Sequence, residues 1–132
     1  MTIPITLSMA AMAALINIWL AIRIGRVRSS AKVSIGDGGN ELLQRRMRAQ
    51  ANFVENAPFV LVLIAAVEIA DHGSMLLWGI GSLFMLARIA HGIGMDGGKA
   101  QIGRMIGTIA TLLVLLGLSV YALAIAGGFT PH

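Results

Sequence analysis

Residues 48–70 read RAQANFVENAPFVLVLIAAVEIA, and they decide the fold because a polar stripe runs directly into an apolar run. Arg48, Asn52 and Glu55 stand at positions i, i+4 and i+7, which places their side chains on one face of a helix. Charged groups at the edge of a membrane span are costly, so they usually serve a ligand, a partner helix or a pore. The segment therefore predicts a membrane-spanning helix with a functional stripe near one end.

The 132-residue chain has the composition of a membrane protein. Hydrophobic residues make up 57% of it and charged residues 12%, about half of the charged share in soluble domains. Four segments are long enough to cross a hydrocarbon core of about 30 Å as helices. With their polar ends, these helices are expected at about residues 3–22, 41–70, 74–94 and 104–127. The predicted fold class is all-α, an integral membrane four-helix bundle in which residues 1–132 form a single domain.

Positive charge indicates how the bundle lies in the membrane. All ten Lys and Arg residues flank the first or the third connection between the spans. By the positive-inside rule, both long connections then lie in the cytoplasm and both termini outside. A net charge of +4 also fits nucleic-acid binding, but the basic clusters lack interleaved aromatic residues, so topology and lipid head groups explain them better. We expect a multi-pass protein, and the Ala- and Gly-rich spans suggest a bacterial inner membrane.

Two absences narrow the chemistry. No charged segment precedes the first apolar run, so we expect a retained span and not a signal peptide. The chain has no cysteine, which excludes disulfides, thiolate metal sites and a cysteine nucleophile, and we expect no metal centre. Any thiol chemistry must therefore use a thiol that the ligand provides.

Three local features predict how the helices begin and pack. Asn17, near the middle of the first span, is expected to make a hydrogen bond between helices. Asn40 follows a glycine-rich turn and is expected to cap the start of the second helix. Gly103 and Gly107 are four residues apart, a spacing that suits close packing of the fourth helix.

Polar side chains gather in the half of the bundle that carries the long connections. Arg88 and His91 lie near the end of the third span and Arg104 opens the fourth, beside the stripe of the second. The opposite half carries Glu68, Asp71 and His72 at its rim. Since positive charge exceeds negative in the cluster, it calls for an anion. A channel would need polar groups along its whole depth, so the pattern favours one site.

Each residue of this cluster also has a structural interpretation. Arg48 and Glu55 can form a salt bridge within their helix, and Arg88 can pair with Glu55 to join the second and third helices. Arg104 can extend to the membrane interface as an anchor. The sequence leaves both interpretations open for each single residue, whereas the group as a whole favours a binding site.

The motif at residues 48–58, RAQANFVENAP, resembles the signature of the MAPEG family, the membrane-associated proteins in eicosanoid and glutathione metabolism. Arg88 and His91 resemble an Arg-x-x-His pair in the third helix of a prostaglandin-synthesising member. Arg104 follows that pair at the same separation as the catalytic arginine of that member. Val27 and Arg28 resemble a Val-Arg pair at the end of its first span. The likeness covers essentially the whole chain, and the helix-two signature is its most specific part.

The resemblance implies a homotrimer that binds glutathione at subunit interfaces near the cytoplasmic face. Arg104 would be the catalytic residue facing the sulfur. The implied glutathione-binding residues are Arg28, Arg48, Asn52, Glu55, Arg88 and His91. The implied activity is that of a glutathione transferase, with glutathione as co-substrate and an apolar electrophile from the bilayer as its partner. Peroxidase activity on a lipid hydroperoxide is the activity that the family resemblance leaves open beside it.

Two departures from the family pattern keep other functions open. Met95 stands where the family often has a tyrosine that contacts glutathione, and Ala51 replaces an arginine of the prostaglandin-synthesising member. Both argue against prostaglandin synthesis, and a non-catalytic scaffold member that binds lipid or glutathione is the alternative. A small four-span exporter would need a membrane-embedded carboxylate. The first, third and fourth spans have none, and Glu55 comes with its own arginines.

Overall fold

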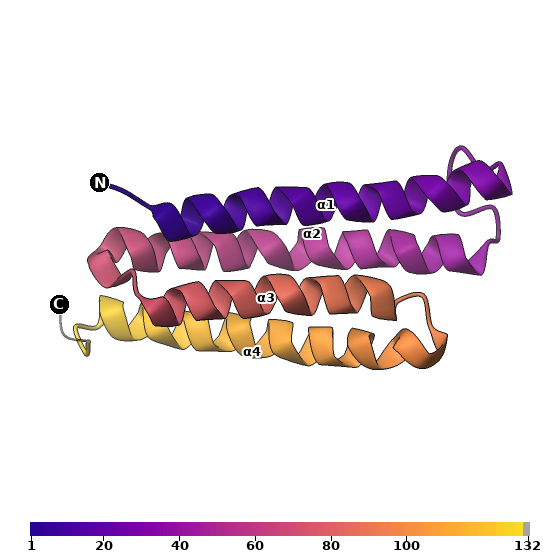
Figure 1. The fold of residues 1–132 in the computed structure, drawn as a ribbon. Coiled ribbons are helices and arrows are strands. Elements are labelled where there is room, and N and C mark those ends of the chain that lie inside the picture. Colours follow the sequence, from indigo (N-terminus) through magenta and orange to yellow (C-terminus); the bar gives the residue numbers. More distant parts are fainter. Residues whose placement is uncertain (131–132) are drawn as a thin grey trace.

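The computed structural model describes residues 1–130, which form four long helices joined by short connections (Figure 1). Their order is α1 (Pro4–Ala31), α2 (Glu41–Val67), the π-helical turn η1 (Glu68–His72), α3 (Met75–Gly94), the 3-10 turn η2 (Gly98–Ala100) and α4 (Gln101–Ala126). No strand occurs among residues 1–130. All four long helices have the length and apolar composition to cross a membrane. These features confirm the predicted all-α fold of four spans.

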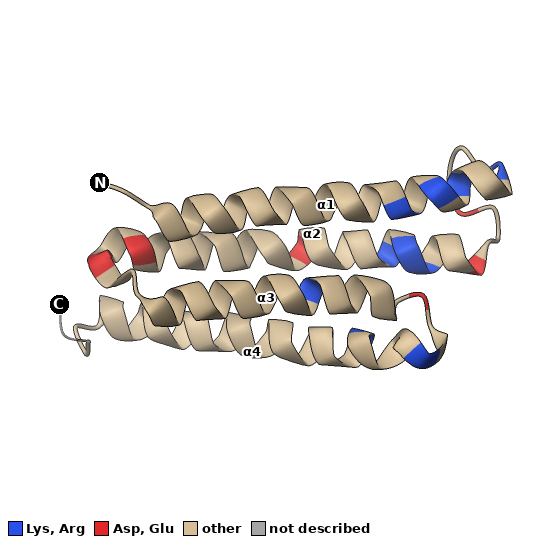
Figure 2. Cartoon of the chain, viewed as in Figure 1, with Lys and Arg blue, Asp and Glu red and all other residues tan. Residues whose placement is uncertain are grey.

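The two ends of the bundle differ in charge. Both long connections, residues 32–40 and 95–100, lie at one end, and both termini lie at the other (Figure 1). Lys and Arg are concentrated in the half that carries these connections, and we call this end the basic end (Figure 2). The charge clusters that are separate along the chain therefore come together in the folded molecule.

The first helix is longer than the sequence indicated. We expected the span to end near residue 22, where the arginines begin, but α1 continues to Ala31. The chain then leaves the helix at Lys32, whose φ of 57° is left-handed and whose backbone N–H donates to the Arg28 carbonyl. A helix can extend past the hydrocarbon because its backbone hydrogen bonds are internal to the segment.

The start of α1 is held by a side chain that follows α2. The Glu68 carboxylate accepts hydrogen bonds from the backbone N–H groups of Ile5, at 2.9 Å, and Thr6, at 2.8 Å. Amides in the first turn have no partner within their own helix, and negative charge is favourable there. Glu68, expected at the rim of the bundle, is therefore a buried tie between α1 and the end of α2.

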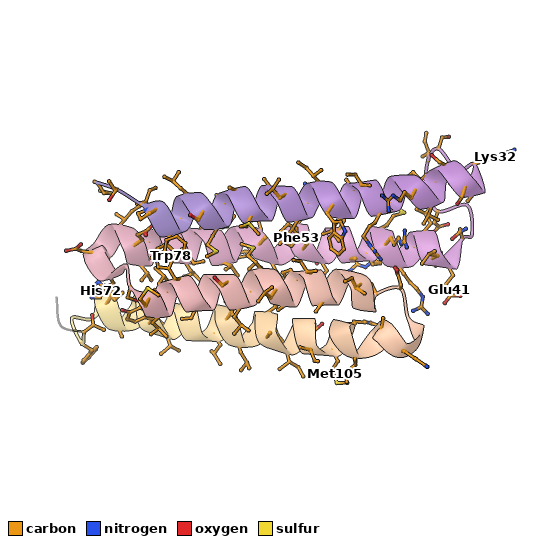
Figure 3. The ribbon with its side chains drawn as sticks, viewed as in Figure 1. Lys32, Glu41, Phe53, His72, Trp78 and Met105 are labelled. Carbon is orange, nitrogen blue, oxygen red and sulfur yellow. The ribbon has the colours of Figure 1, made fainter. Side chains whose placement is uncertain are left out.

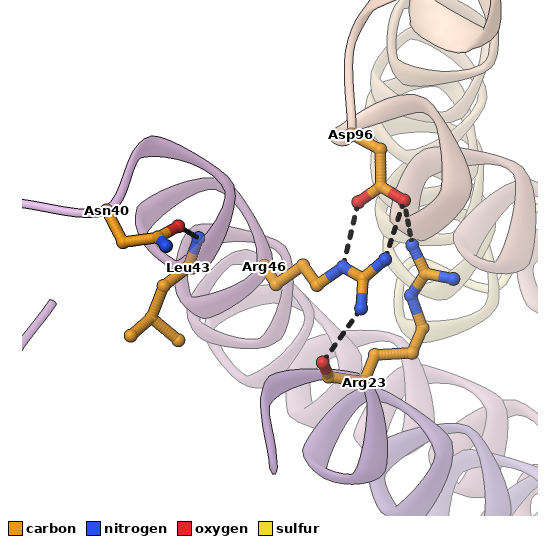
Figure 4. Close-up of polar contacts among 5 residues, drawn as sticks. All are labelled: Arg23, Asn40, Leu43, Arg46 and Asp96. Carbon is orange, nitrogen blue, oxygen red and sulfur yellow. Dashed lines mark hydrogen bonds and ion pairs between the residues drawn. The ribbon is translucent and has the colours of Figure 1, made fainter. Parts of the chain in front are cut away.

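The second helix begins as the sequence predicts. The Asn40 side chain accepts a hydrogen bond from the backbone N–H of Leu43 at 3.0 Å, which confirms the predicted cap (Figure 4). Regular α-helix ends at Val67, and η1 carries the chain on to His72. The left-handed φ of 66° at Asp71 then turns the chain toward α3.

A large apolar core runs along the bundle, and a small second cluster of Ile24, Val27 and Leu43 lies at the basic end. The helices α1 and α4 are separated by α2 and α3 (Figure 1). Phe84 and Leu118 are among the fully enclosed side chains of the large core, and Phe53 is buried in it with them. Phe53 points into the bundle, whereas Met105 points outward from α4 (Figure 3). Apolar side chains thus occupy both the core and much of the outer surface, as a bilayer environment requires.

Two predicted contacts between helices are present. The Gln50 side-chain amide of α2 donates to the Asn17 Oδ1 of α1 at 3.2 Å. An added Cβ at Gly107 would lie 2.5 Å from the His91 Cβ, and one at Gly103 would lie 2.6 Å from an α3 carbonyl oxygen. Only glycine permits this approach at either position, so α3 and α4 pack closely beside the polar cluster.

Candidate functional site

Arg88 of α3 is the centre of the polar cluster and is only 2% exposed. Its Nη2 donates to the Asn52 Oδ1 of α2 at 2.7 Å, and its Nη1 donates to the Thr111 Oγ1 of α4 at 3.1 Å. The same Nη2 lies 3.5 Å from the His91 Nδ1. One guanidinium therefore joins three helices at the height of the α2 stripe.

The groups that contact the charged guanidinium of Arg88 are neutral. Its guanidinium carbon lies 5.9 Å from the centre of the Phe53 ring, a cation–π arrangement. Among residues 1–130 no carboxylate forms a salt bridge with it, so the proposed pairing with Glu55 is absent and Asn52 takes that place. The Arg88 Nε is buried without a hydrogen-bond partner. A buried cation with spare donor capacity is thus part of the cluster.

The α2 stripe presents its charges outward. The side chains of Arg48 and Glu55 are 63% and 60% exposed, and their charged atoms are 4.0 Å apart. This separation is the outer limit of a salt bridge, so their mutual attraction is weak at such exposure. Asn52, between them along the helix, is half-buried because its side chain turns toward Arg88. Both charges of the stripe remain accessible to a ligand or to another chain.

Arg104 lies on the surface at the start of α4. It borders an open groove of about 590 Å³, lined by Gln101, Ile102, Arg104, Met105, Thr108 and Ile109. Gly94, at the end of α3, leaves room for the backbone of Arg104 beside it. Gly94 follows His91 by three residues on α3, so this contact places the start of α4 beside the helix that carries His91. The groove thus combines one cation with a mainly apolar wall.

Arg28 lies on another side of the bundle. Its Nη1 donates to the Gly36 carbonyl at 2.7 Å, which holds the first connection against α1. It also borders a groove of about 450 Å³ between α1 and α2, together with Gln50 and Ala51. Because α1 and α4 are separated by the other two helices, this groove and the Arg104 groove lie on different faces of one chain (Figure 1).

An ion cluster that the sequence did not suggest closes the basic end. Asp96, in the connection before η2, accepts from Arg23 of α1 at 2.5 Å and from Arg46 of α2 at 3.1 Å (Figure 4). Arg46 also donates to the Arg23 carbonyl at 2.9 Å. Partial burial raises the pKa of Asp96, but the hydrogen bonds and charges of the two arginines outweigh it and hold the pKa below its ordinary value. The sequence offered one hint of this cluster, because Asp96 is an isolated acidic residue in a glycine-rich connection of a chain with more basic than acidic residues.

The structure brings part of the expected site together. Asn52 and His91 each contact the Arg88 guanidinium, and the backbone of Arg104 lies beside Gly94 at the end of the same helix. Arg48 and Glu55 flank Asn52 on the outer face of α2, while Arg28 lies apart from the cluster. No group of three metal-binding side chains occurs among residues 1–130.

Four membrane-length helices with a polar cluster toward one end define the class as a multi-pass helical membrane protein with a polar site near one membrane edge. The matching family model is that of the MAPEG family and covers residues 6–124, so the chain belongs to this family. The family includes glutathione transferases as well as members without catalytic activity. A search of curated proteins found no match to the chain.

Proposed function

We propose that this MAPEG protein is a membrane-bound glutathione transferase. The observation that carries the proposal is the α2 stripe, in which Arg48 and Glu55 remain exposed on a membrane-length helix on either side of Asn52. Charged groups on a membrane-spanning helix are costly and usually serve a ligand, a partner helix or a pore. Glutathione, with two carboxylates, one ammonium and a thiol, offers complementary groups.

The charges of the site match those of the tripeptide. An arginine fork binds a carboxylate through two parallel hydrogen bonds, which favours Arg48 as a carboxylate ligand. Glu55 is the acidic group of the stripe and suits the ammonium. Asn52 and His91 supply neutral polar contacts beside them. Arg28 lies in a separate groove of one chain, so it joins such a site only where a second copy completes it.

We assign the activation of the thiol to Arg104. A free thiol has a pKa of about 8.5, so only a few per cent of it is thiolate at neutral pH. Lowering that pKa by about two units requires roughly 2.7 kcal/mol. One guanidinium at about 4 Å supplies this energy at the intermediate dielectric of a membrane edge.

The groove beside Arg104 suits a substrate that arrives from the bilayer. Ile102, Met105 and Ile109 line it, and these side chains are exposed on the outer surface of α4. The thiolate would attack an electrophilic carbon, forming the S–C bond while the leaving group departs with the bonding electron pair. A lipid hydroperoxide in the same groove is the corresponding peroxidase substrate.

We also propose that the protein is a homotrimer with glutathione between subunits. A single chain leaves the stripe uncovered and places the Arg28 and Arg104 grooves on different faces. A second copy packed against α2 would cover the stripe and could bring two such faces together. The charge distribution favours an orientation with the basic end in the cytoplasm and both termini outside, and we assign the protein to a bacterial inner membrane.

A conjugation assay tests the proposed activity. The purified protein in detergent is mixed with glutathione and 1-chloro-2,4-dinitrobenzene, an apolar electrophile, and the initial rate is measured. We expect turnover in the wild type and in Arg26→Ala, which removes an exposed α1 arginine outside the cluster. Arg48→Ala should raise the glutathione concentration needed for half-maximal rate. A wild-type rate equal to that of empty detergent would refute the transferase.

The second candidate is a non-catalytic scaffold, and one observation favours it. Met95, at the position where the family often has a tyrosine, packs against the apolar core and brings no hydroxyl to the site. Saturable binding of glutathione or lipid without conjugation or peroxidase turnover would support the scaffold over the enzyme.

A further inference from the structure

The hydrogen bond between Arg88 and Asn52 determines how the Asn52 amide is turned. A guanidinium only donates, so the atom that faces Arg88 must be the amide oxygen and not the amide nitrogen. This assignment follows from chemistry even where oxygen and nitrogen look alike in a structure. The separation of 2.7 Å is that of a strong, charge-assisted hydrogen bond. Arg88 therefore directs the Asn52 nitrogen away from itself.

The Asn52 nitrogen is left available. Asn56 donates to the Asn52 carbonyl at 2.8 Å and lies 3.5 Å from its Oδ1, so both neighbours engage oxygen atoms of Asn52. Within residues 1–130 the Nδ2 of Asn52 has no acceptor, and it is not fully buried. The amide thus presents two N–H groups on the half-buried side of the stripe.

Arg88 constrains the His91 ring in the same way. Its Nη2 lies 3.5 Å from the His91 Nδ1, which is too far for a strong hydrogen bond. At this distance a proton on Nδ1 would point at the N–H of Arg88, so the Nδ1 atom is expected to carry no proton. Neutral imidazole carries a single proton, which must then be on Nε2. The Nε2 atom makes no hydrogen bond within residues 1–130 and retains some accessible surface. His91 is thereby also a donor without an acceptor.

We propose that Arg88 is a positioning residue that sets Asn52 and His91 as hydrogen-bond donors, so that this part of the site selects acceptor groups such as a carboxylate, a peptide carbonyl or a thiolate. The inference deepens the proposed function and rests on it for the identity of the ligand. The resemblance implied that Arg88 contacts glutathione itself. Because Arg88 is buried, it instead acts through Asn52 and His91, which would contact the ligand. Glu55 remains the hydrogen-bond acceptor of the stripe and would bind the ammonium group of glutathione.

The tautomer of His91 tests the positioning role without any ligand. Nitrogen-15 NMR of the ring in detergent-solubilised protein, at about pH 8 where ordinary imidazole is neutral, distinguishes a proton on Nε2 from one on Nδ1. The chain has three histidines, and His91→Gln assigns the signal. We expect the Nε2–H form in the wild type. A wild-type ring protonated on Nδ1 would overturn the proposal, and this result needs no variant.

Two substitutions separate positioning from simple structural support. Arg88→Met removes every donor, and it should yield a mixture of both His91 tautomers. Thr111→Val is the matched control, because it removes one buried hydrogen bond of the same guanidinium but leaves the Nη2 contacts in place. We expect Thr111→Val to keep the wild-type tautomer. An unchanged tautomer in folded Arg88→Met would refute the role of Arg88.

Glutathione affinity completes the test. Equilibrium dialysis should show about tenfold weaker binding in Arg88→Met, the effect of losing about one hydrogen bond, and a change within about twofold in Thr111→Val. Equal losses in both variants would reduce Arg88 to a structural role. A wild type that binds no glutathione would refute the proposed function, while the tautomer measurement would still decide whether Arg88 positions His91.

Discussion

At the scale of single residues, arginine serves three purposes in this protein that its charge alone does not distinguish. Arg88 is buried and donates to neutral acceptors, Arg46 pairs with the Asp96 carboxylate, and Arg48 is 63% exposed on the stripe. The fixed fork of the guanidinium suits all three, because its donors can reach several acceptors at once. Substitution of each arginine should therefore affect a different property: the geometry of the site, the stability of the fold or the binding of a ligand.

The bond between Asn52 and Arg88 should be important for stability. Asn52→Leu leaves a buried guanidinium donor without its acceptor, which typically costs about 2–3 kcal/mol. We expect that loss in denaturant unfolding of the detergent-solubilised protein. The control is Thr108→Val, whose exposed hydroxyl bonds only to a carbonyl of its own helix and should change stability by less than about 0.5 kcal/mol. Equal effects of the two substitutions would contradict this assignment.

At the scale of helices, two acidic side chains tie segments that are distant along the chain. Glu68 holds the first turn of α1, and Asp96 holds the connection before α4 to both α1 and α2. They lie at opposite ends of the bundle, since Glu68 is in η1 after α2 and Asp96 is in the connection between α3 and η2. The apolar faces pack the helices together in the middle, and these two ties fix their ends. The Asp96 tie also helps to place the start of α4, where Arg104 lies.

The Asp96 cluster should make stability depend on acid pH. The pKa of Asp96 is lower in the folded protein than in the unfolded chain, so its contribution is complete above the unfolded value of about 3.9 and is lost as the pH falls toward the folded value. We expect Asp96→Asn to lower the melting temperature at pH 7 and to flatten its decline below about pH 4. The exposed Glu41→Gln is the control, and an identical pH profile in Asp96→Asn and the wild type would contradict the tie.

The Glu68 tie should be visible at the start of α1. Glu68→Ala removes the acceptor of two backbone amides and should cost about 1 kcal/mol, as loss of a helix cap does. Hydrogen exchange should accelerate at the Ile5 and Thr6 amides. The Leu43 amide, capped separately by Asn40, serves as the internal control. Acceleration at all three amides alike would indicate general loosening instead of a lost cap.

The sequence predicted the helices better than it predicted the side-chain hydrogen bonds that join their ends. The lengths of the apolar segments identify four spans. Asn40 predicts the start of α2 because its capping hydrogen bond is a local contact, with Leu43 three residues away. The extension of α1 to Ala31 was missed because charge after an apolar run marks the edge of the hydrocarbon and not the end of a helix. Glu68 bonds to residues more than sixty positions away. No local pattern specifies such a partner.

At the scale of the whole molecule, the surface of one chain is not uniformly suited to contact with lipid. Its outer surface is largely apolar, yet Arg48 and Glu55 stand exposed on a spanning helix. The Arg28 and Arg104 grooves occupy different faces. Both features are accounted for if copies of the chain pack against the stripe, and this is why we place the site between subunits.

The proposed trimer can be tested directly. Native mass spectrometry from detergent should show a particle of three 13.9 kDa chains. Glu55→Leu should alter the population of trimers, since it changes the stripe that the proposed interface covers, whereas Leu116→Ala, on the outer face of α4, should not. A wild-type monomer that binds glutathione would contradict a site that requires a second copy.

The composition of the site was easier to predict than its geometry. The i, i+4, i+7 spacing indicated one shared face for the stripe, but only Arg48 and Glu55 are exposed together, whereas Asn52 is half-buried and bonds to Arg88 of the third helix. The sequence suggested Glu55 as the partner of Arg88, because opposite charges attract, but packing turns Asn52 inward and Glu55 outward. Which member of a stripe faces the core depends on the rotation of the helix, and small differences in that rotation decide between neighbouring side chains.

The central claim is that Arg104 activates a bound thiol, and an ultraviolet titration tests it most directly. Glutathione is added to the detergent-solubilised protein at neutral pH while thiolate absorbance is followed, in the wild type, Arg104→Ala and the control Arg26→Ala. We expect a saturable thiolate signal in the wild type and the control. Arg104→Ala should still bind glutathione but lose that signal. Glutathione bound by the wild type without thiolate, or a full signal in Arg104→Ala, would contradict the account.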